Sequence, residues 1–237
     1  MIFNTKNIPQ NKEDFTKALE ERIVSGKLAA GTRLPTEREF SEQTGIGKSA
    51  IHAAVMELER KGFVDIVPRK GAYVADFAKT GTIDTLSEVL RCNGGKLSFD
   101  MSVNIVQLRN AIEGGALLRL AENHTDDDIK KLRTALDKLR QADIKTIEVP
   151  EIAALERGFH MLICELSGNS MFSLVLNSFM YLSAAIWQYC ALFWGLEGFI
   201  AHDEALIDMI ERGEGNKARE YIEDIFAQFL DAFFKND

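Results

Sequence analysis

Apolar residues in the first sixty positions recur with the period of an α-helix. The first run predicts a helix over residues 12–25, in which Phe15, Leu19 and Ile23 lie on one side. The second run predicts a helix over residues 48–61. Its apolar side is formed by Ile51, Val55 and Leu58.

A shorter helix is predicted between these two. Thr36 and Glu39 have the spacing of a capping box, in which each residue satisfies the other's free backbone N–H, so a helix should begin at Thr36. Gly45 and Gly47 then provide a turn from which the helix over 48–61 can leave at a steep angle. This spacing predicts a helix-turn-helix.

The residues after position 61 predict a β-hairpin. Gly62 ends the helix, residues 63–67 alternate as a strand, residues 68–71 form a turn with basic side chains, and residues 72–75 return. Such a hairpin beside a helix-turn-helix is the wing of a winged helix. Small and basic residues at the exposed start of the preceding helix suit a major groove, namely Lys48, Ser49, Ala50, His52 and Ala53.

Beyond the hairpin the pattern predicts helices and no convincing strand. We therefore expect a mainly α chain with a winged-helix domain over 1–76, a linker over 77–83 and an all-helical domain over 84–237. About seven helices are predicted for the C-terminal part, over residues 82–91, 102–124, 125–142, 150–167, 170–195, 196–212 and 216–234.

One predicted helix lies in a segment without charged residues, between Glu165 and Glu197. The segment is long enough to cross a bilayer, but it contains Asn177, Ser178, Ser183 and Gln188 and lacks flanking basic anchors. We therefore predict no membrane span and expect the central helix of a bundle. Its aromatic side chains should partly face a cavity or a subunit interface, namely Tyr181, Trp187, Tyr189 and Phe193.

The charges are divided unevenly along the chain. The net charge is −8, yet residues 1–75 hold 12 Lys and Arg against 10 Asp and Glu, whereas residues 76–237 hold 16 against 26. Nucleic acid should therefore contact only the first domain. The three cysteines form no CxxC pair, and the N-terminus lacks the apolar core of a signal peptide, so a cytoplasmic location is expected.

The first domain resembles the winged helix of GntR-family bacterial transcription regulators. The resemblance rests on the runs Gly31–Glu39, Gly47–Val55, Gly62–Val64 and Lys70–Val74. It implies that Arg38 and Lys48 contact an operator and that Gly71 lies at the wing tip near the minor groove. The family commonly has Ser-Arg at Gly47-Lys48 and arginine at His52, so the operator sequence does not carry over. The candidate DNA-contacting residues are Arg38, Lys48, Ser49, Ala50, His52, Lys70 and Gly71.

The helical domain resembles, more weakly, the FCD-type effector domain of the FadR-like subgroup. The runs Glu156–His160, Leu166–Asn169 and His202–Leu206 carry this resemblance, with Glu156 in place of the usual aspartate. It implies a divalent metal such as Zn, Ni or Mn at the floor of a small-molecule pocket, although Ile225 stands where a third histidine is expected.

Helical spacing adds a geometric argument for this site. Glu156 and His160 lie on one helical face and could hold one ion together with His202. A hydrogen-bonded histidine pair in a polar pocket, without metal, is the alternative. Asn169 belongs to the same resemblance and is a candidate effector ligand.

Arg109 is the remaining candidate, at a position where the family often has an arginine that meets an anionic effector. Its guanidinium could grip a carboxylate with two hydrogen bonds, or it could only pair with Glu113 one helical turn away. No nucleophile elbow, P-loop or dinucleotide fingerprint is present, so an enzyme is not expected.

These observations together predict a ligand-responsive regulator, a repressor that binds a palindromic operator as a homodimer and responds to a small anionic metabolite such as a carboxylate or sugar acid. Two alternatives stay open. The effector could be an acyl-CoA, which would make the protein a regulator of lipid metabolism, or the helical domain could be a metal-dependent enzyme joined to a DNA-binding module. The effector, the operator and the sign of regulation do not follow from the residues.

Overall fold

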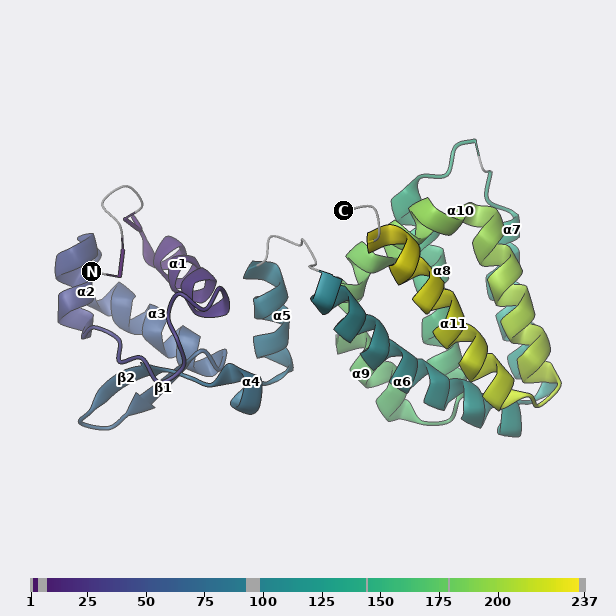
Figure 1. The fold of residues 1–237 in the computed structure, drawn as a ribbon, viewed down its shortest axis with the longest axis horizontal. Helices are drawn as coiled ribbons and strands as arrows, with labels where there is room; N and C mark the ends of the chain where they lie inside the picture. The colour runs from purple at the N-terminus through teal and green to yellow at the C-terminus, as the bar shows by residue number, and fades with distance from the viewer. Residues whose placement is uncertain (1, 4–7, 93–98, 144, 179, 235–237) are drawn as a thin grey trace. The chain divides into compact units, whose positions relative to one another are not determined.

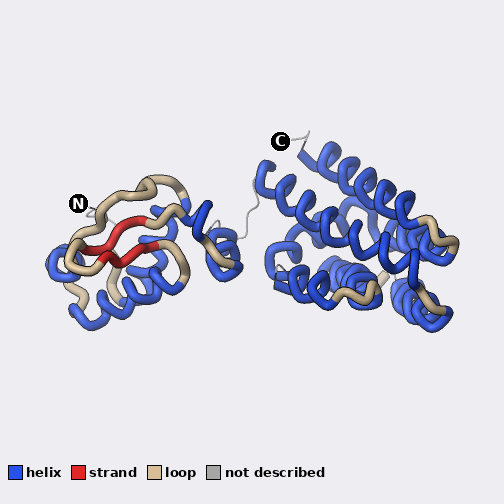
Figure 2. The backbone as a smooth tube through the Cα atoms, turned by 90° about the horizontal axis from the view of Figure 1, so that it is seen from below, coloured by secondary structure: helices blue, strands red, loops and turns tan. Residues whose placement is uncertain are grey.

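The computed structural model describes residues 2–3, 8–92, 99–143, 145–178 and 180–234. The chain divides into two compact units, Met1–Lys96 and Leu97–Asp237. Within the described ranges, the only paired strands belong to the first unit, and the second unit consists of helices (Figures 1 and 2). The predicted fold class, a winged helix-turn-helix followed by an all-helical bundle, is confirmed.

Three helices form the body of the first unit. The capping box at the second helix is present, because Thr36 Oγ1 accepts from the Glu39 N–H at 3.2 Å and the Glu39 carboxylate accepts from the Thr36 N–H at 2.7 Å. Gly45, with φ 77°, ends that helix. The three helices are α1 (Lys12–Val24), α2 (Glu37–Thr44) and α3 (Lys48–Arg60).

The core of this unit lies between the predicted apolar faces. Phe15 on α1 packs edge-on against Phe40 on α2, with ring centroids 4.9 Å apart. Both rings are fully buried. The faces predicted from the periodicity are also buried, namely Leu19, Ile23, Ile51, Val55 and Leu58.

The wing is a two-stranded antiparallel hairpin of β1 (Val64–Val67) and β2 (Gly71–Val74), in which Val64 is opposite Val74. The chain leading into α2 lies along β2. The Leu34 N–H donates to the Ala72 carbonyl and the Val74 N–H donates to the Thr32 carbonyl, both at 2.9 Å. This extra pairing, which the sequence pattern did not predict, fixes the wing beside the start of α2.

Two further helices, α4 (Phe77–Thr80) and α5 (Ile83–Cys92), also belong to the first unit. Phe77 packs against Phe63 at a centroid distance of 5.7 Å, and Thr85 donates to the Lys61 carbonyl at 2.7 Å. The segment 77–83, predicted as a linker, therefore lies inside this unit. Residues 82–91, predicted as the first helix of the bundle, form α5 against α1 instead.

A charged cluster attaches α5 to α1 and α3. The Lys61 ammonium lies 2.8 Å from Glu20, 3.1 Å from Glu57 and 3.1 Å from Glu88. Arg91 pairs with Glu20 at 2.5 Å and with Glu88 at 2.6 Å. Because the Glu20 carboxylate is fully buried, its charge depends on these partners.

The second unit is a bundle in which α6 packs along α11 and α8 packs along α10 (Figure 1). A capping box of Thr125 and Asp128 begins α7, as the run of acidic residues there predicts. The helices are α6 (Phe99–Asn123), α7 (Asp126–Arg140), α8 (Val149–Leu166), α9 (Ser170–Ser178), α10 (Met180–Glu211) and α11 (Gly215–Phe234).

The uncharged segment forms α9 and the first half of α10, and residue 179 between them, within the single helix predicted over 170–195, lies outside the described residues. The predicted break at residue 195 is present, because Gly195 has φ 64° and ψ −173° and kinks α10. Trp187 is buried inside the bundle and Tyr189 is half-buried, whereas Phe193 is 45% exposed. The side chain of Tyr181 lies outside the described set. Across the described residues, no helix combines the length and apolar character that crossing a bilayer requires.

Candidate DNA-binding face and effector site

The start of α3 is suited to an anion. Its N-cap is Gly47, which makes no side-chain capping bond, and its first turn contains no acidic residue. The first N–H groups of the helix therefore point outward beside the exposed Lys48 and Ser49. Lys48 makes no ion pair with any residue that the structure describes. This end of α3 can approach a phosphate or a base edge.

The other candidates on these helices have different surroundings. Arg38 on α2 is largely exposed and only loosely paired with Glu42 at 3.7 Å. His52 is engaged, because its Nδ1 lies 2.7 Å from the Glu37 carboxylate. Ala50 is half-buried against the core, so its contact surface for DNA is smaller than the sequence analysis expected. At the wing, Lys70 and Gly71 are both exposed.

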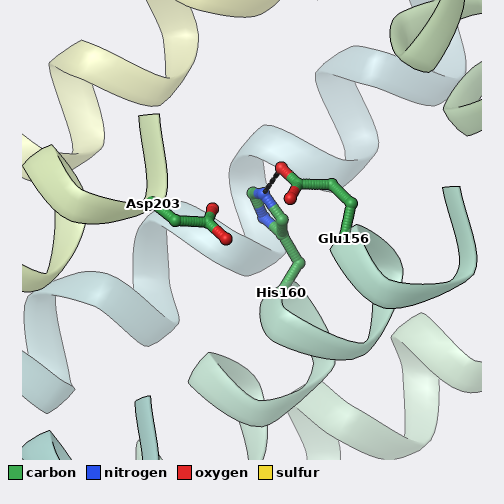
Figure 3. A group of neighbouring side chains, drawn as sticks. All are labelled: Glu156, His160 and Asp203. Carbon is green, nitrogen blue, oxygen red and sulfur yellow. Dashed lines mark ion pairs between the residues drawn. The ribbon is translucent and has the colours of Figure 1, made fainter. Parts of the chain in front are cut away.

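The second unit contains a buried polar cluster. Glu156 and His160 lie one turn apart on α8, and Asp203 on α10 points toward them (Figure 3). The His160 Nε2 is 3.4 Å from the Glu156 Oε1. On its other side, the His160 Nδ1 is 2.7 Å from Glu113 of α6. These four side chains come from three helices and are almost completely buried.

Arg109 extends this cluster along α6. Its Nε and Nη2 lie 2.8 Å and 2.7 Å from the Glu113 Oε1, so the predicted pair with Glu113 forms, but in the interior rather than at the surface. The guanidinium also lies over the rings of Trp187 at 4.0 Å and Phe226 at 4.8 Å. Its Nη1 is buried without a hydrogen-bond partner in the described structure.

The charges of this cluster shift the pKa values of Glu113 and His160. Burial acts to raise the pKa of Glu113, but the positive charges of Arg109 and His160 outweigh it and lower that pKa to about 2. Burial acts to lower the pKa of His160, but Glu113 and Glu156 outweigh it and raise that pKa to about 9. At neutral pH, Glu113 is therefore ionised and His160 carries a proton.

The two remaining carboxyl groups affect each other. Burial raises the pKa of Asp203 well above its usual value, and the negative charge of Glu156 raises it further. The pKa of Glu156 is raised by burial, although its bond to His160 opposes this. Because two buried carboxylates this close repel, each disfavours ionisation of the other, and a bound cation would favour the ionised form of both.

Glu156, His160 and Asp203 fit a divalent cation. Each offers one ligand atom, and these atoms lie within 4.8 Å of one another. Both Asp203 oxygens and the Glu156 Oε2 are buried, and none of them accepts a hydrogen bond within the described structure. Glu113 orients the His160 ring from behind, as a second-sphere carboxylate does for a metal-binding histidine. Two carboxylates and an imidazole suit Zn²⁺ or Mn²⁺.

His202, named as a ligand in the sequence analysis, lies outside this group. Its Nδ1 is 3.0 Å from the Tyr221 hydroxyl, and its ring packs against Trp194 at 5.2 Å. One residue along a helix turns the side chain by about 100°, so its neighbour Asp203 enters the cluster instead. The signal was present in the sequence, because Asp203 shares a helical face with the buried Leu206, Ile207 and Ile210.

Two further positions named in the sequence analysis, Asn169 and Ile225, make contacts within the fold. Asn169 caps the start of α9, where its Oδ1 accepts from the Met171 N–H at 3.1 Å. It is not among the residues that line the cavity beside Arg109. Ile225, where the resemblance implied a third histidine, is a buried apolar residue of α11.

That cavity is small, about 10 Å³, which is room for about one water molecule. Arg157, one residue after Glu156, reaches it and makes no ion pair with the part of the chain that the structure describes. Any larger ligand therefore requires the surrounding side chains to move. The cavity is lined by Arg109, Glu113, Arg157, His160, Met161, Leu176 and Trp187.

Comparison with known protein families decides the class of the chain. The FCD domain family matches residues 104–228, and the bacterial regulatory proteins of the gntR family match residues 11–74. The chain belongs to the gntR family and carries an FCD domain. This family consists of transcription regulators, so the alternative of an enzyme joined to a DNA-binding module is wrong.

Relatives within the gntR family include proteins with opposite regulatory signs. The HTH-type transcriptional repressor NanR of Klebsiella aerogenes is 30% identical over 164 residues, which cover 68% of this chain and 60% of NanR. The Glc operon transcriptional activator of Escherichia coli K12 is 24% identical over 168 residues, covering 70% of this chain and 64% of the activator. The chain thus spans 60% to 64% of the length of these relatives.

One solved structure has a similar fold. The protein Lar, described as controlling expression of the Listeria monocytogenes agr system, superposes with a TM-score of 0.55 at 15% identity. The superposition covers 92% of this chain and 94% of Lar. At this identity the likeness concerns the fold alone.

Proposed function

We propose that this protein is a transcription regulator that binds an operator duplex as a homodimer and changes its DNA affinity when a small anion binds the FCD domain. One observation carries the proposal. A single chain joins a winged helix whose α3 begins with exposed N–H groups and Lys48 to a bundle containing a buried, incompletely satisfied polar cluster. An anion that favours one arrangement of the bundle would shift operator affinity by its differential affinity for the two states.

Selection from genomic DNA tests the DNA-binding part. Fragments retained by the full chain should share an inverted repeat, because a dimer presents two copies of α3 to two half-sites. Lys48→Ala should lose this enrichment, whereas Lys138→Ala at an exposed site on α7 should keep it. Enrichment of no common sequence by the wild-type protein would refute the proposal. We infer repression as the sign, following NanR.

The anionic effector follows from the surroundings of Arg109. Arg109, whose buried Nη1 has no hydrogen-bond partner in the described structure, and the unpaired Arg157 both line the cavity beside His160, and a carboxylate accepts well from guanidinium groups. A panel of monocarboxylates, dicarboxylates and sugar acids should contain a compound that raises the Tm and releases operator DNA. The matching amide should do neither. Arg109→Lys should weaken both effects, and a response to the amide equal to that of the acid would contradict the assignment.

The acyl-CoA alternative has less support. A long acyl chain requires an apolar cavity of several hundred Å³. The cavity beside Arg109 is about 10 Å³ and is lined by four charged or titratable side chains. A carboxylate of a few carbons needs a smaller rearrangement, so we favour it.

We further propose that Glu156, His160 and Asp203 hold a divalent metal. The support is the convergence of their ligand atoms within 4.8 Å and the three buried oxygens without a donor from another described group. When bound, the metal would supply positive charge that a ligand carboxylate could coordinate. Elemental analysis of the protein purified without chelator should find close to one ion per chain. Less than a tenth of an ion per chain, after dialysis against Zn²⁺ or Mn²⁺ as well, would contradict this.

The homodimer is proposed from the apolar surface of the second unit. Five large apolar side chains there are at least 40% exposed, and they lie on α6, α9 and the first half of α10. No charged residue occurs between Glu165 and Glu197 to oppose a second copy of the same surface. Light scattering at micromolar concentration should give twice the chain mass of 26.5 kDa. The five side chains are Leu108, Met171, Leu174, Leu192 and Phe193.

A further inference from the structure

The tip of the wing contains an unusual backbone conformation. The Lys70 N–H donates to the Val67 carbonyl at 3.0 Å, which closes a four-residue turn. Arg69 in this turn has φ 64°, and among the described residues it is the only non-glycine residue with a positive φ. Turns of this kind need the left-handed conformation at the third position, where glycine is strongly preferred. The turn requires that backbone conformation but not an arginine side chain.

No contact among the described residues explains why an arginine stands there. The Arg69 side chain is exposed and makes no hydrogen bond or ion pair with any described residue. An L-residue in this region carries a conformational cost that glycine avoids. A strained, exposed cation without an internal partner points to a partner outside the chain.

Arg33 lies beside the same turn. Its two chain neighbours, Thr32 and Leu34, are hydrogen-bonded to β2, and Arg33 itself bridges to Tyr73. The guanidinium lies over Gly71, where an added Cβ would be 3.6 Å from Nε and 3.7 Å from Nη2. Arg33 is exposed and has no hydrogen bond or ion pair in the part of the chain described. The backbone pairing thus holds a second unpaired guanidinium at the wing.

Several other cations of this unit are already engaged. Lys12, Arg60, Lys61 and Arg91 all pair with carboxylates. Two acidic side chains lie near the wing. The Glu39 carboxylate accepts hydrogen bonds from the N–H and the hydroxyl group of Thr36, and Asp65 is opposite Tyr73 on the hairpin. The wing therefore presents Arg33, Arg69 and Lys70 together, with their charges available.

We propose that Arg33 and Arg69 form, with Lys70, a phosphate-binding site for the DNA backbone at the wing. The proposal rests on the proposed DNA-binding function and adds two residues to the interface. Exposed guanidinium groups bind phosphate oxygens through paired hydrogen bonds, and such contacts position a protein without reading sequence. Arg33 and Arg69 thereby anchor the wing while α3 reads the bases.

The salt dependence of binding to one fixed, non-operator 30-base-pair duplex tests this directly, because phosphate contacts do not depend on sequence. Each lost contact should lower the magnitude of the slope of log K against log salt by about 0.9. Because a dimer loses one contact at each of its two wings, each single substitution should lower it by about 1.8 and weaken binding about sixtyfold near 0.1 M salt. We expect this for Arg33→Ala and for Arg69→Ala, with additive slopes in the double variant. Lys17→Ala, at an exposed and unpaired lysine on α1, should change neither quantity.

A glycine variant separates this role from a structural one. Arg69→Gly removes the guanidinium but suits the turn, so its Tm should be equal to or above that of the wild type while its DNA affinity falls as for Arg69→Ala. A slope unchanged in Arg33→Ala, Arg69→Ala and Arg69→Gly, with wild-type binding intact, would overturn the phosphate site alone. Failure of the wild-type protein to bind any duplex would overturn the proposed function as well.

Discussion

At the scale of single residues, the helical face decides which side chain enters the effector site. The spacing of Glu156 and His160 was enough to predict that they act together. The sequence analysis named His202, because the run His202–Leu206 resembles the second histidine motif of the family, whereas the apolar pattern after it places Asp203 inward. The burial of Arg109 could not be predicted from its pairing with Glu113, because burial depends on how Trp187 and Phe226 pack over it.

The neighbouring pair His202 and Asp203 allows a matched test of the metal site. Added Zn²⁺ or Mn²⁺ should raise the Tm of the wild-type protein, since a ligand that binds only the folded state stabilises it. Asp203→Asn should abolish this rise, because it removes one of the three converging ligands. His202→Ala should retain it. Thermal unfolding with and without metal measures both, and a loss only in His202→Ala would reverse the assignment.

Glu113 supports a second residue-scale prediction. It contacts Arg109 and His160, both buried, so Glu113→Gln removes the carboxylate paired with Arg109 and one of the two paired with His160. Breaking a buried pair in this way costs roughly 3–5 kcal/mol of unfolding free energy. Glu122→Gln, at an exposed site on the same helix, should stay within about 0.5 kcal/mol. Urea unfolding measures the difference, and equal stability of the two variants would mean that Glu113 does not balance these charges.

At the scale of helices and strands, local sequence signals predicted where helices end better than they predicted which helices pack together. Glycine at position 195 and the caps at Thr36 and Thr125 marked their helix ends correctly. The placement of α5 was missed, since its attachment depends on Glu20 and Lys61, which are distant in sequence.

The kink in α10 can be tested by comparing two glycine-to-alanine substitutions. Gly195 has φ 64°, so Gly195→Ala forces an L-residue into the left-handed region and should cost about 1–2 kcal/mol. Gly158, in the middle of α8, has no atom within 4 Å of an added Cβ and no positive φ. Gly158→Ala should therefore stabilise by about 0.5–1 kcal/mol. Chemical denaturation measures both, and effects of the same sign would contradict the kink geometry.

The stability contributed by the charged cluster that attaches α5 to α1 and α3 should fall at both low and high pH. The hydrogen bond from Lys12 lowers the pKa of Glu57. Burial acts to raise the pKa of Glu88, but Arg91 and Lys61 outweigh it and lower that pKa. Their contribution is therefore present above the unfolded value of about 4.3 and is lost as pH falls through the lowered pKa values. Burial acts to lower the pKa of Lys61, but its three glutamate partners outweigh it, so its contribution is lost as pH rises through the raised pKa.

Glu88→Gln provides the measurement for this cluster. Amide hydrogen exchange of α5 should be faster than in the wild type at pH 6, because one carboxylate of the cluster is gone. After correction for intrinsic exchange rates, the difference should shrink as the pH falls through the lowered pKa of Glu88, where the wild-type carboxylate also becomes neutral. Glu13→Gln at an exposed site on α1 should match the wild type. A difference that does not depend on pH would exclude charge as its cause.

At the scale of the whole molecule, the uneven division of charge explains how one acidic chain can bind DNA. Residues 1–75 carry a small positive excess, while the remainder carries 26 acidic against 16 basic residues. From this division the sequence predicts DNA contact in the first unit. It could not define the dimer surface, because the exposure of Leu192 and Phe193 depends on how α10 packs within the bundle.

Assembly and DNA binding should therefore depend on each other. Leu192→Asp places a charge on the surface assigned to the second copy, so the variant should be monomeric at micromolar concentration. The salt slope for a fixed duplex should then fall to about half of the wild-type value, because one winged helix neutralises half as many phosphates as two. Ala154→Asp adds the same charge at an exposed site on α8 and should leave mass and slope unchanged. Light scattering and fluorescence anisotropy measure these quantities, and a monomeric Leu192→Asp with the full wild-type slope would show that the two winged helices do not bind DNA together.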